Sequence, residues 1–287
     1  MRKWHWFFEK TASRDYEEDD LPSTRPEVFW DVLKNQYRVL LGISLLLFLF
    51  ALPFLGVHLY LDLQKAVTYQ AFTAGSLAED AYQDQIDMLN RLFLITIPIG
   101  AMIFSIGLAG AARIFKRLCF LQPVFFFDDF KKGVKENTWY FMGMAFLSLA
   151  IFSIFAWIRT LDPSNFIYSI LLALSLVIVY PAFLFFIPVA SLYQTKFLSA
   201  LGISFRIYFR SFLPFLPFLL GFVAPLGVEF IPDVAIKYIV LCLALVLVGP
   251  LLTLAFFLFS YWRFDKYINK ERYPELVDRG VHRKKSH

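Results

Sequence analysis

The sequence predicts an all-α integral membrane protein with six transmembrane helices, on the grounds of its composition, its apolar segments and its charge distribution. Of the 287 residues, 59% are apolar and 35 are Phe, whereas soluble domains average roughly 45–50% apolar residues. The mean hydropathy is accordingly positive, at +0.59. A net charge of +5 would suggest an acidic partner in a soluble protein. In a membrane protein the placement of charges matters more than their sum, so no nucleic-acid partner is expected.

The chain divides into a cytoplasmic N-terminal arm at 1–24, a transmembrane domain at 25–262 and a cytoplasmic tail at 263–287. A membrane crossing takes about 20 mostly apolar residues in a helix, because the hydrocarbon core offers no water to satisfy the backbone. Six stretches meet this requirement, at 39–60, 92–112, 139–158, 166–193, 212–228 and 238–262. The fourth is long for one crossing and contains two prolines, so a kink or tilt is expected. The fifth is the weakest, because three prolines interrupt it.

The distribution of Lys and Arg predicts that both termini are cytoplasmic. The two terminal segments and the loops after the second and fourth spans carry 24 of the 28 Lys and Arg residues. The three alternate loops carry Lys65, Arg91, Arg159 and Lys237. The long acidic loop at 61–91 is therefore expected outside the cell. The N-terminal arm lacks the apolar core of a cleavable signal peptide, so the first span must direct insertion.

A charged, aromatic segment precedes each odd-numbered span, at 25–42, 127–143 and 196–213. The first two segments match closely in sequence, and the third shares their pattern but not their residues. This regularity predicts three hairpins, each made of a cytoplasmic interfacial amphipathic helix followed by two spans.

The second segment shows why these helices are expected at the membrane surface. At helical period Phe127, Phe130 and Phe141 fall near one stripe, and the lysines fall away from it. Such a helix lies in the headgroup layer, with its lysines near the phosphates of anionic lipids. The residues assigned to the three interfacial helices are Phe29, Trp30, Lys34, Phe127, Phe130, Lys131, Lys132, Lys135, Phe205, Arg206 and Arg210.

Two adjacent carboxylates, Asp128 and Asp129, are the first candidates for catalysis or metal binding. Neighbouring residues on a helix point about 100° apart, and no third carboxylate follows at helical spacing, so a helix start is favoured over an active site. Thr24 and Glu27 form a similar start upstream of the first span, in the pattern of a capping box with Pro26 in the first turn.

No other residues form a recognisable catalytic, cofactor or metal site. The four histidines are His5, His58, His282 and His287, and none has a Ser, Cys or acidic partner at a typical spacing. The two cysteines, Cys119 and Cys242, are expected on the cytoplasmic side and within a span, so they form no disulfide framework. The six spans contain no Asp, Glu, Lys or Arg, which ion-coupled carriers usually retain. We therefore expect no catalysis, no cofactor and no metal.

Small residues in the second span predict close helix packing. Ser105 lies four residues before Ala109, and Gly107 lies four residues before Ala111. This spacing lets another helix approach. Packing within the chain is favoured over a dimer interface, and the oligomeric state stays open.

The chain resembles the YesL family of bacterial membrane proteins. The similarity rests on "DDFKKGVKENTWYF" after "GLAGAARIFKRL", on the basic-aromatic segment near 196–212, and above all on the ending "FDKYINKERYPELVDRGV". The residues of this family-like tail are Phe264, Asp265, Lys266, Tyr267, Ile268, Pro274 and Gly280. The resemblance implies a multi-spanning protein of the bacterial plasma membrane, often encoded beside carbohydrate-utilisation genes, with no established activity. The N-terminal arm and the long outer loop are less typical of the family.

Two functions remain open. The first is a non-enzymatic accessory or regulatory protein that acts with a sugar importer complex. The alternative is a transporter or permease subunit for a small solute, since Ala200, Gly202 and Leu213-Pro214 are faintly similar to the coupling loop of importer permeases. The acidic residues of that loop are missing here. A membrane enzyme ranks third, because it would need polar residues that converge at one depth.

Overall fold

A computed structural model describes residues 21–162, 164, 166–193 and 195–282, and the regular structure in these residues is helical throughout. Six helices are long and apolar enough to cross a membrane, at 37–73, 79–119, 126–161, 166–193, 197–223 and 234–272. This confirms the predicted all-α architecture with six spans, which is that of a multi-pass membrane protein. The N-terminal arm before residue 21 and the tail after residue 282 lie outside the described residues.

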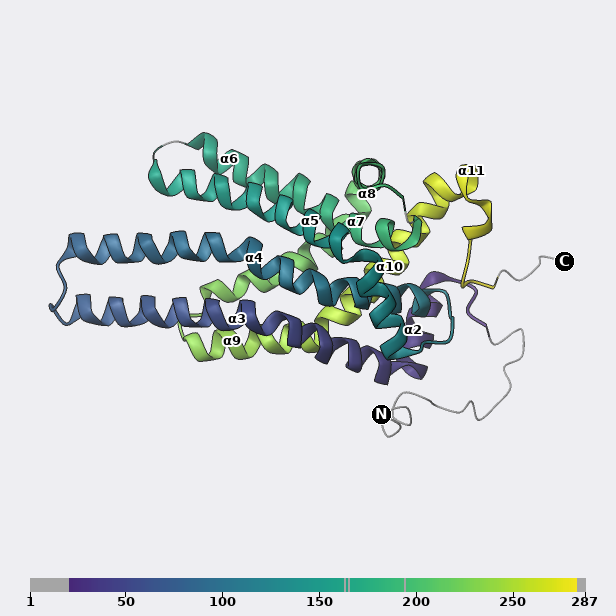
Figure 1. Cartoon of the computed structure of the whole chain (residues 1–287), viewed down its shortest axis with the longest axis horizontal. Helices are drawn as coiled ribbons and strands as arrows, with labels where there is room; N and C mark the ends of the chain where they lie inside the picture. Colours follow the sequence, from purple (N-terminus) through teal and green to yellow (C-terminus); the bar gives the residue numbers. More distant parts are fainter. Residues whose placement is uncertain (1–20, 163, 165, 194, 283–287) are drawn as a thin grey trace.

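Along the long axis of the molecule run helices α3 (Tyr37–Thr73), α4 (Glu79–Cys119), α5 (Phe126–Leu161) and α6 (Phe166–Leu174), whereas the labelled part of α8 (Phe197–Val223) is seen end-on (Figure 1). Both described ends of the chain lie at one end of the molecule (Figure 1). There the amide of His282 donates a hydrogen bond to the carbonyl of Pro22, with an N···O distance of 2.8 Å. We call this the terminal end. The opposite end, where the turn at 74–78 joins two long helices, is the distal end (Figure 1).

The expected outer loop at 61–91 is mostly helix. Helix α3 (Tyr37–Thr73) continues well past the first apolar span, and α4 (Glu79–Cys119) begins well before the second. At 1.5 Å per residue each helix is about 55–60 Å long, roughly twice the hydrocarbon thickness. The stretch contains no Pro, and its single glycine, Gly75, lies in the turn with φ of 72°. Nothing in the sequence therefore stops either helix at the membrane surface.

The three charged, aromatic segments adopt two different structures. The first contains a separate helix, α2 (Arg25–Asn35), which ends one residue before α3. Thr24 and Pro26 begin α2 as the sequence predicts, and the Thr24 side chain accepts a hydrogen bond from the amide of Glu27. The other two segments run without a break into their spans, as the first turns of α5 (Phe126–Leu161) and α8 (Phe197–Val223). A helix distinct from its span is thus present once, not three times.

Prolines explain two interruptions of the α-helical pattern. The fourth span consists of α6 (Phe166–Leu174), a π-helical segment η2 (Ser175–Val179) and α7 (Tyr180–Tyr193). Pro181 lacks an N–H, so it cannot donate to the carbonyl of Val177 four residues earlier. The hydroxyl of Tyr208 on α8 donates to that carbonyl instead. The neighbouring helix thus satisfies a backbone group that the proline leaves open.

The sixth span repeats this arrangement. It contains α9 (Val234–Leu243), the π-helical η4 (Ala244–Val248) and α10 (Gly249–Phe264). Pro250 is the second residue of α10, as Pro181 is of α7. The chain then continues through η5 (Asp265–Asn269), α11 (Lys270–Arg272) and η6 (Pro274–Leu276). Between the fifth and sixth spans lies the 3₁₀ segment η3 (Ala224–Phe230).

Aromatic rings fill the core where α7, α8 and α10 meet. The ring of Phe185 lies 5.1 Å from that of Phe215 and 5.2 Å from that of Phe256, and all three side chains are buried. Phe115 of α4 stacks against Phe257 in the same core, at 5.4 Å. Such pairs add to the energy of apolar burial. The centre of the bundle is therefore a packed aromatic core, with the ionisable groups at its ends.

Candidate functional site

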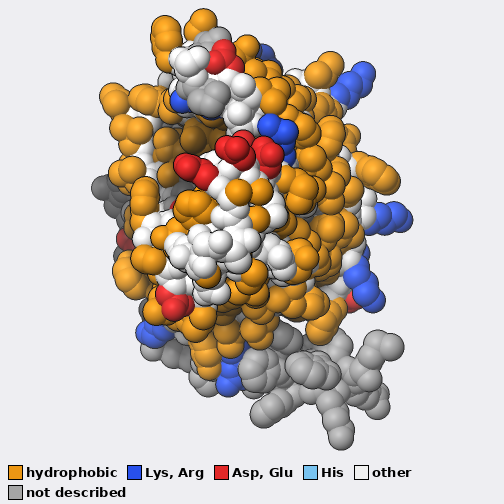
Figure 2. All heavy atoms as spheres, turned by 90° about the vertical axis from the view of Figure 1, so that its left-hand side faces the viewer, with side chains coloured by type: hydrophobic (Ala, Val, Ile, Leu, Met, Phe, Trp, Pro, Cys, Tyr) orange, Lys and Arg blue, Asp and Glu red, His pale blue; other side chains and the backbone are white. Residues whose placement is uncertain are grey.

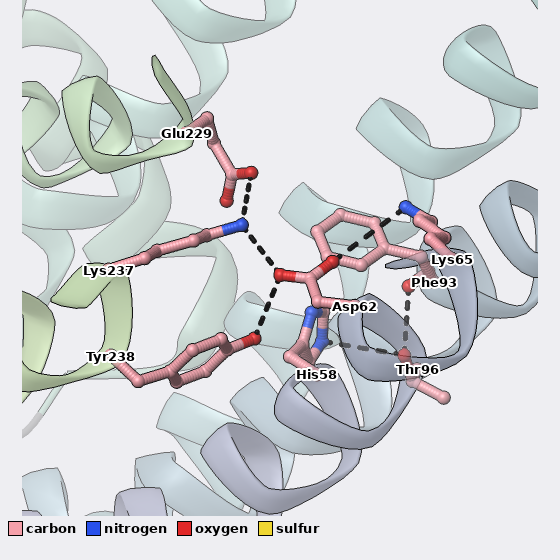
Figure 3. A network of polar contacts seen from close by, with 8 residues as sticks. All are labelled: His58, Asp62, Lys65, Phe93, Thr96, Glu229, Lys237 and Tyr238. Carbon is pink, nitrogen blue, oxygen red and sulfur yellow. Dashed lines mark hydrogen bonds and ion pairs between the residues drawn. The ribbon is translucent and has the colours of Figure 1, made fainter. Parts of the chain in front are cut away.

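Charged side chains just beyond the distal ends of the apolar spans, twelve residues before Ala74 in the distal turn, join the first span to the last (Figure 3). Lys237 of α9 lies 2.6 Å from a carboxylate oxygen of Asp62 on α3 and 2.6 Å from one of Glu229 in η3. The hydroxyl of Tyr238 also donates to Asp62, at 3.2 Å. Lys65 adds a longer contact of 3.9 Å to the same carboxylate. Two cations thus offset two anions, and we call these five residues the distal cluster.

His58 lies one helical turn from Asp62 and is buried between aromatic rings (Figure 3). Its ring lies 4.1 Å from that of Phe54 and 4.2 Å from that of Phe93. Its Nε2 is 3.4 Å from the hydroxyl of Thr96. The distal face carries acidic side chains with hydrophobic ones around them (Figure 2). The balanced charges and close contacts of the distal cluster suit a structural link between helices.

A second group of charges lies at the terminal end, between α4 and α5. Asp129 is 1% exposed, and it pairs with Arg117 at 2.8 Å and with Arg113 at 3.4 Å. Arg113 also pairs with Glu136. The second oxygen of Asp129 accepts a hydrogen bond from the amide of Phe125, which caps the start of α5. The expected helix start is therefore present, and the same carboxylate also fixes two arginines.

The family-like tail is joined to the start of α2 by a buried ion pair and hydrogen bonds, which we call the lock. Asp265 accepts a hydrogen bond from Arg25 at 2.9 Å and one from Asn269 at 2.7 Å. The hydroxyl of Tyr193 donates to the side-chain oxygen Oδ1 of Asn269 at 2.6 Å. Arg25 donates a further bond to the backbone carbonyl of Arg279, at 2.8 Å. Residues distant in sequence thus hold the two described ends of the chain together.

The remaining tail residues support this lock. Phe264 and Ile268 are buried in the core, while the ring of Tyr267 lies under Arg263 and Lys266. Pro274 begins η6. Gly280 has φ of 83°, and a Cβ at this position would lie 2.5 Å from the carbonyl oxygen of Cys119. Only a glycine fits the close approach of the tail to the end of α4.

The small residues predicted for packing lie between α3 and α5. Ser105, Gly107, Ala109 and Ala111 are all buried. A Cβ on Gly107 would meet the ring of Phe50 of α3 at 2.7 Å. A Cβ on Gly133 of α5 would lie 2.7 Å from the carbonyl of Ala109. Gly133 completes this close crossing, although no spacing of small residues in α5 predicted it.

The residues expected at the interface face several directions. Trp30 and Phe127 are exposed, Phe29, Phe130 and Phe205 are half-buried, and Lys34, Lys131, Lys132, Lys135, Arg206 and Arg210 are exposed. The buried face at the start of α5 runs through Phe126, Asp129, Gly133, Asn137 and Phe141. It therefore shares Phe141 with the expected stripe but leaves out Phe127, which is exposed. The reason is that this segment packs against α4 through a polar and glycine face.

Two adjoining cavities lie beside the charged residues Asp129, Arg113, Arg117 and Glu136. We call these two cavities the recess. One has a volume of about 170 Å³ and is lined by Arg113, Lys116, Arg117 and Arg279 as well as by neutral groups. The other has about 280 Å³ and is lined in part by Tyr140, Ala190 and Thr195. Glu136 and Asn137 line both cavities. Sequence reasoning missed the recess, because its residues come from α4, α5, the end of α7 and the tail.

In the described part of the chain, no three His, Cys, Asp or Glu side chains are placed to hold a metal ion. Comparison of the chain with models of protein families, with curated proteins and with solved structures finds no match. The six long apolar helices by themselves indicate the class of the protein, which is a multi-pass membrane protein.

Proposed function

We propose that the protein is a non-enzymatic accessory or regulatory component of the bacterial plasma membrane, linked to carbohydrate uptake or utilisation. The observation that carries the proposal is that the centre of the protein is packed, whereas its cavities lie at one end. An aromatic core fills the centre where α7, α8 and α10 meet, and the two cavities lie at the terminal end, together with the ion pairs of Asp129 and of Asp265. Such a body is suited to present a surface at one side of the membrane. The link to carbohydrates comes from the resemblance to the YesL family.

The proposed orientation places the terminal end in the cytoplasm. It is supported by 24 of the 28 Lys and Arg residues, which belong to segments on that side. In this arrangement the chain forms three hairpins, and the lysines and arginines at the starts of α2, α5 and α8 lie near anionic lipid headgroups. The aromatic side chains beside them enter the membrane surface.

Purification from the native membrane tests this function. A tagged chain is extracted in a mild detergent, and copurifying proteins are identified, with an untagged strain as the control. We expect subunits of a sugar importer complex to be recovered, and a deletion strain to take up less of the corresponding sugar. Recovery of the chain alone, together with normal sugar uptake in the deletion strain, would contradict the proposal.

A transporter or permease subunit is the second candidate, and the interrupted helices favour it. Both the fourth and the sixth span contain a π-helical segment next to a proline. Interruptions of this kind often occur at functional sites and in the broken helices of transporters. Reconstitution of the purified chain in liposomes separates the two functions. Flux of a sugar through the chain alone would favour the transporter, and flux only in the presence of further subunits would favour the accessory role.

A further inference from the structure

The recess at the terminal end carries an excess of positive charge. Four cationic side chains line the smaller cavity, and Glu136 is the acidic residue among the lining. Asp129 does not line the cavity itself but pairs with two of the lining residues, Arg113 and Arg117. Even with both carboxylates counted, two positive charges remain uncompensated. Burial and the neighbouring cations Arg113 and Arg279 lower the pKa of Lys116, which lies beyond the apolar stretch of α4.

Several polar groups of the recess have no partner in the described part of the chain. Asn137 is 95% buried, since its exposed fraction is 5%, and its amide forms no hydrogen bond there although it lines both cavities. The hydroxyl of Thr195 is buried and also unpaired among these residues. The guanidinium of Arg279 lies 5.2 Å from the ring of Phe120 and forms no ion pair within the described chain. Buried polar groups nearly always have a partner, so the amide of Asn137 and the hydroxyl of Thr195 point to a ligand. Arg279 is exposed and adds a cation to the lining of the smaller cavity.

The arrangement of these groups defines the chemistry of that ligand. The basic side offers guanidinium and ammonium donors, which bind a phosphate through short charge-assisted hydrogen bonds. The neutral side offers an amide and hydroxyls, which suit a hydroxyl-bearing body. The two cavities together have the size of a small-ligand site, which is on the order of 300–1,000 Å³.

We propose that the recess binds a phosphate group that carries a small hydroxyl-bearing body. Arg279 and Lys116 contact the phosphate oxygens, and Asn137 and Thr195 contact the hydroxyls. Arg113 and Arg117 contribute charge while they remain fixed by Asp129. The phosphate comes either from the headgroup of an anionic phospholipid or from a soluble phosphate ester. A headgroup can reach this depth, because Lys116 lies four residues beyond the second apolar span. This binding goes beyond the proposed accessory function and does not depend on it.

Thermal unfolding of the full chain in a neutral detergent tests the site with two probes. The first is glycerol 3-phosphate, and the second is short-chain phosphatidylglycerol. Glycerol and a short-chain phosphatidylcholine serve as the uncharged and zwitterionic controls. A saturable rise in melting temperature with glycerol 3-phosphate assigns the site to a soluble ester, and a rise with phosphatidylglycerol alone assigns it to a lipid. No rise with either probe, or an equal rise with the controls, would overturn the proposal.

Variants locate the binding in the recess. Arg279→Gln removes a charge that no carboxylate balances, while the backbone carbonyl that Arg25 needs is kept. We expect the dissociation constant of the effective probe to rise about tenfold to a hundredfold, as for loss of a hydrogen bond to a charged group. Arg272→Gln removes the same charge at an exposed position that lines neither cavity, and it should leave the constant unchanged. An equal effect of both variants would show non-specific attraction and would overturn the site.

Asn137→Leu provides a second, independent variant. It keeps the size of a buried side chain and removes the amide from both cavities, with no change in charge. We expect weaker binding of the effective probe and an unchanged or raised melting temperature without it, because an unpaired buried amide is removed. Unchanged affinity in this variant and in Arg279→Gln would contradict binding in the recess.

Discussion

Asp129 combines a buried position with three partners. Its carboxylate accepts a backbone hydrogen bond at the start of α5 and pairs with two arginines at the end of α4. A buried carboxylate costs several kcal/mol unless such partners compensate it. The residue therefore fixes the angle at which α5 leaves α4, and the charge is a structural element of the terminal end.

Asp129→Asn tests this role. The variant leaves two arginines without their carboxylate, so we expect a loss of about 3 kcal/mol in the free energy of unfolding. The melting temperature in detergent measures the effect, and Asp128→Asn, at the exposed neighbour, is the matched control. Equal melting temperatures for the two variants would show that burial and ion pairing of Asp129 contribute nothing.

At the residue scale, the sequence indicated a helix start at Asp129 but gave no sign of its ion partners. Helix-start residues are local, because the cap and the amides it meets lie within one turn. Arg113 and Arg117 are separated from Asp129 by the turn between two helices, and a single sequence does not show which charges meet across a turn. Lys237 was likewise expected as a separate loop charge, although it belongs to the distal cluster.

Helices α4 and α5 cross at glycine and alanine surfaces. A Cβ on Gly133 would lie 2.7 Å from the carbonyl of Ala109 and 2.9 Å from that of Gly110. Gly133→Ala must push the two helices apart, and we expect a loss of about 1–3 kcal/mol. Melting temperatures in detergent measure it.

Gly202→Ala is the control for this substitution. Nothing lies within 4 Å of the Cβ position at Gly202 on α8, so alanine meets no obstacle there. We expect no loss, and a gain of up to about 1 kcal/mol from the higher helix propensity of alanine. If Gly133→Ala were as well tolerated as Gly202→Ala, the close crossing of α4 and α5 would be refuted.

The link between α8 and η2 depends on one hydroxyl. Tyr208→Phe removes the donor to the Val177 carbonyl, which Pro181 has already deprived of a helical partner. We expect a loss of about 1–3 kcal/mol, because the carbonyl of Val177 loses the donor that replaces the missing proline amide. Tyr60→Phe, at an exposed tyrosine, should change the melting temperature little. An unchanged melting temperature in Tyr208→Phe would contradict this account of the π-helical segment.

At the element scale, apolar runs located all six spans, since the bilayer imposes their length and composition. The same runs did not locate the helix ends. Helices α3 and α4 continue into polar sequence at 61–91, because polar residues of good helix propensity extend a helix outside the membrane as easily as they form a loop. The separate interfacial helices were predicted from amphipathic pattern alone, which does not show whether a helix stops before its span.

Across the whole molecule, the distal cluster connects helices that are far apart in the sequence. Asp62→Asn removes one of the two carboxylates that hold Lys237, whose side chain is 8% exposed. We expect a loss of about 1–3 kcal/mol, smaller than for a lone buried pair because Glu229 remains. Asp84→Asn, at an exposed carboxylate of α4, is the control. Equal melting temperatures would show that the first and last spans do not depend on this ion pair.

The orientation of the chain is the central claim, because it decides which side of the membrane presents the terminal end to the proposed partners. Alkaline phosphatase, which is active only outside the cytoplasm, is inserted after Ala74 at the distal turn, and a green fluorescent protein is fused after His287. We expect phosphatase activity from the first fusion and fluorescence from the second. Inactivity of both, with activity restored when the two reporters are exchanged, would contradict the account.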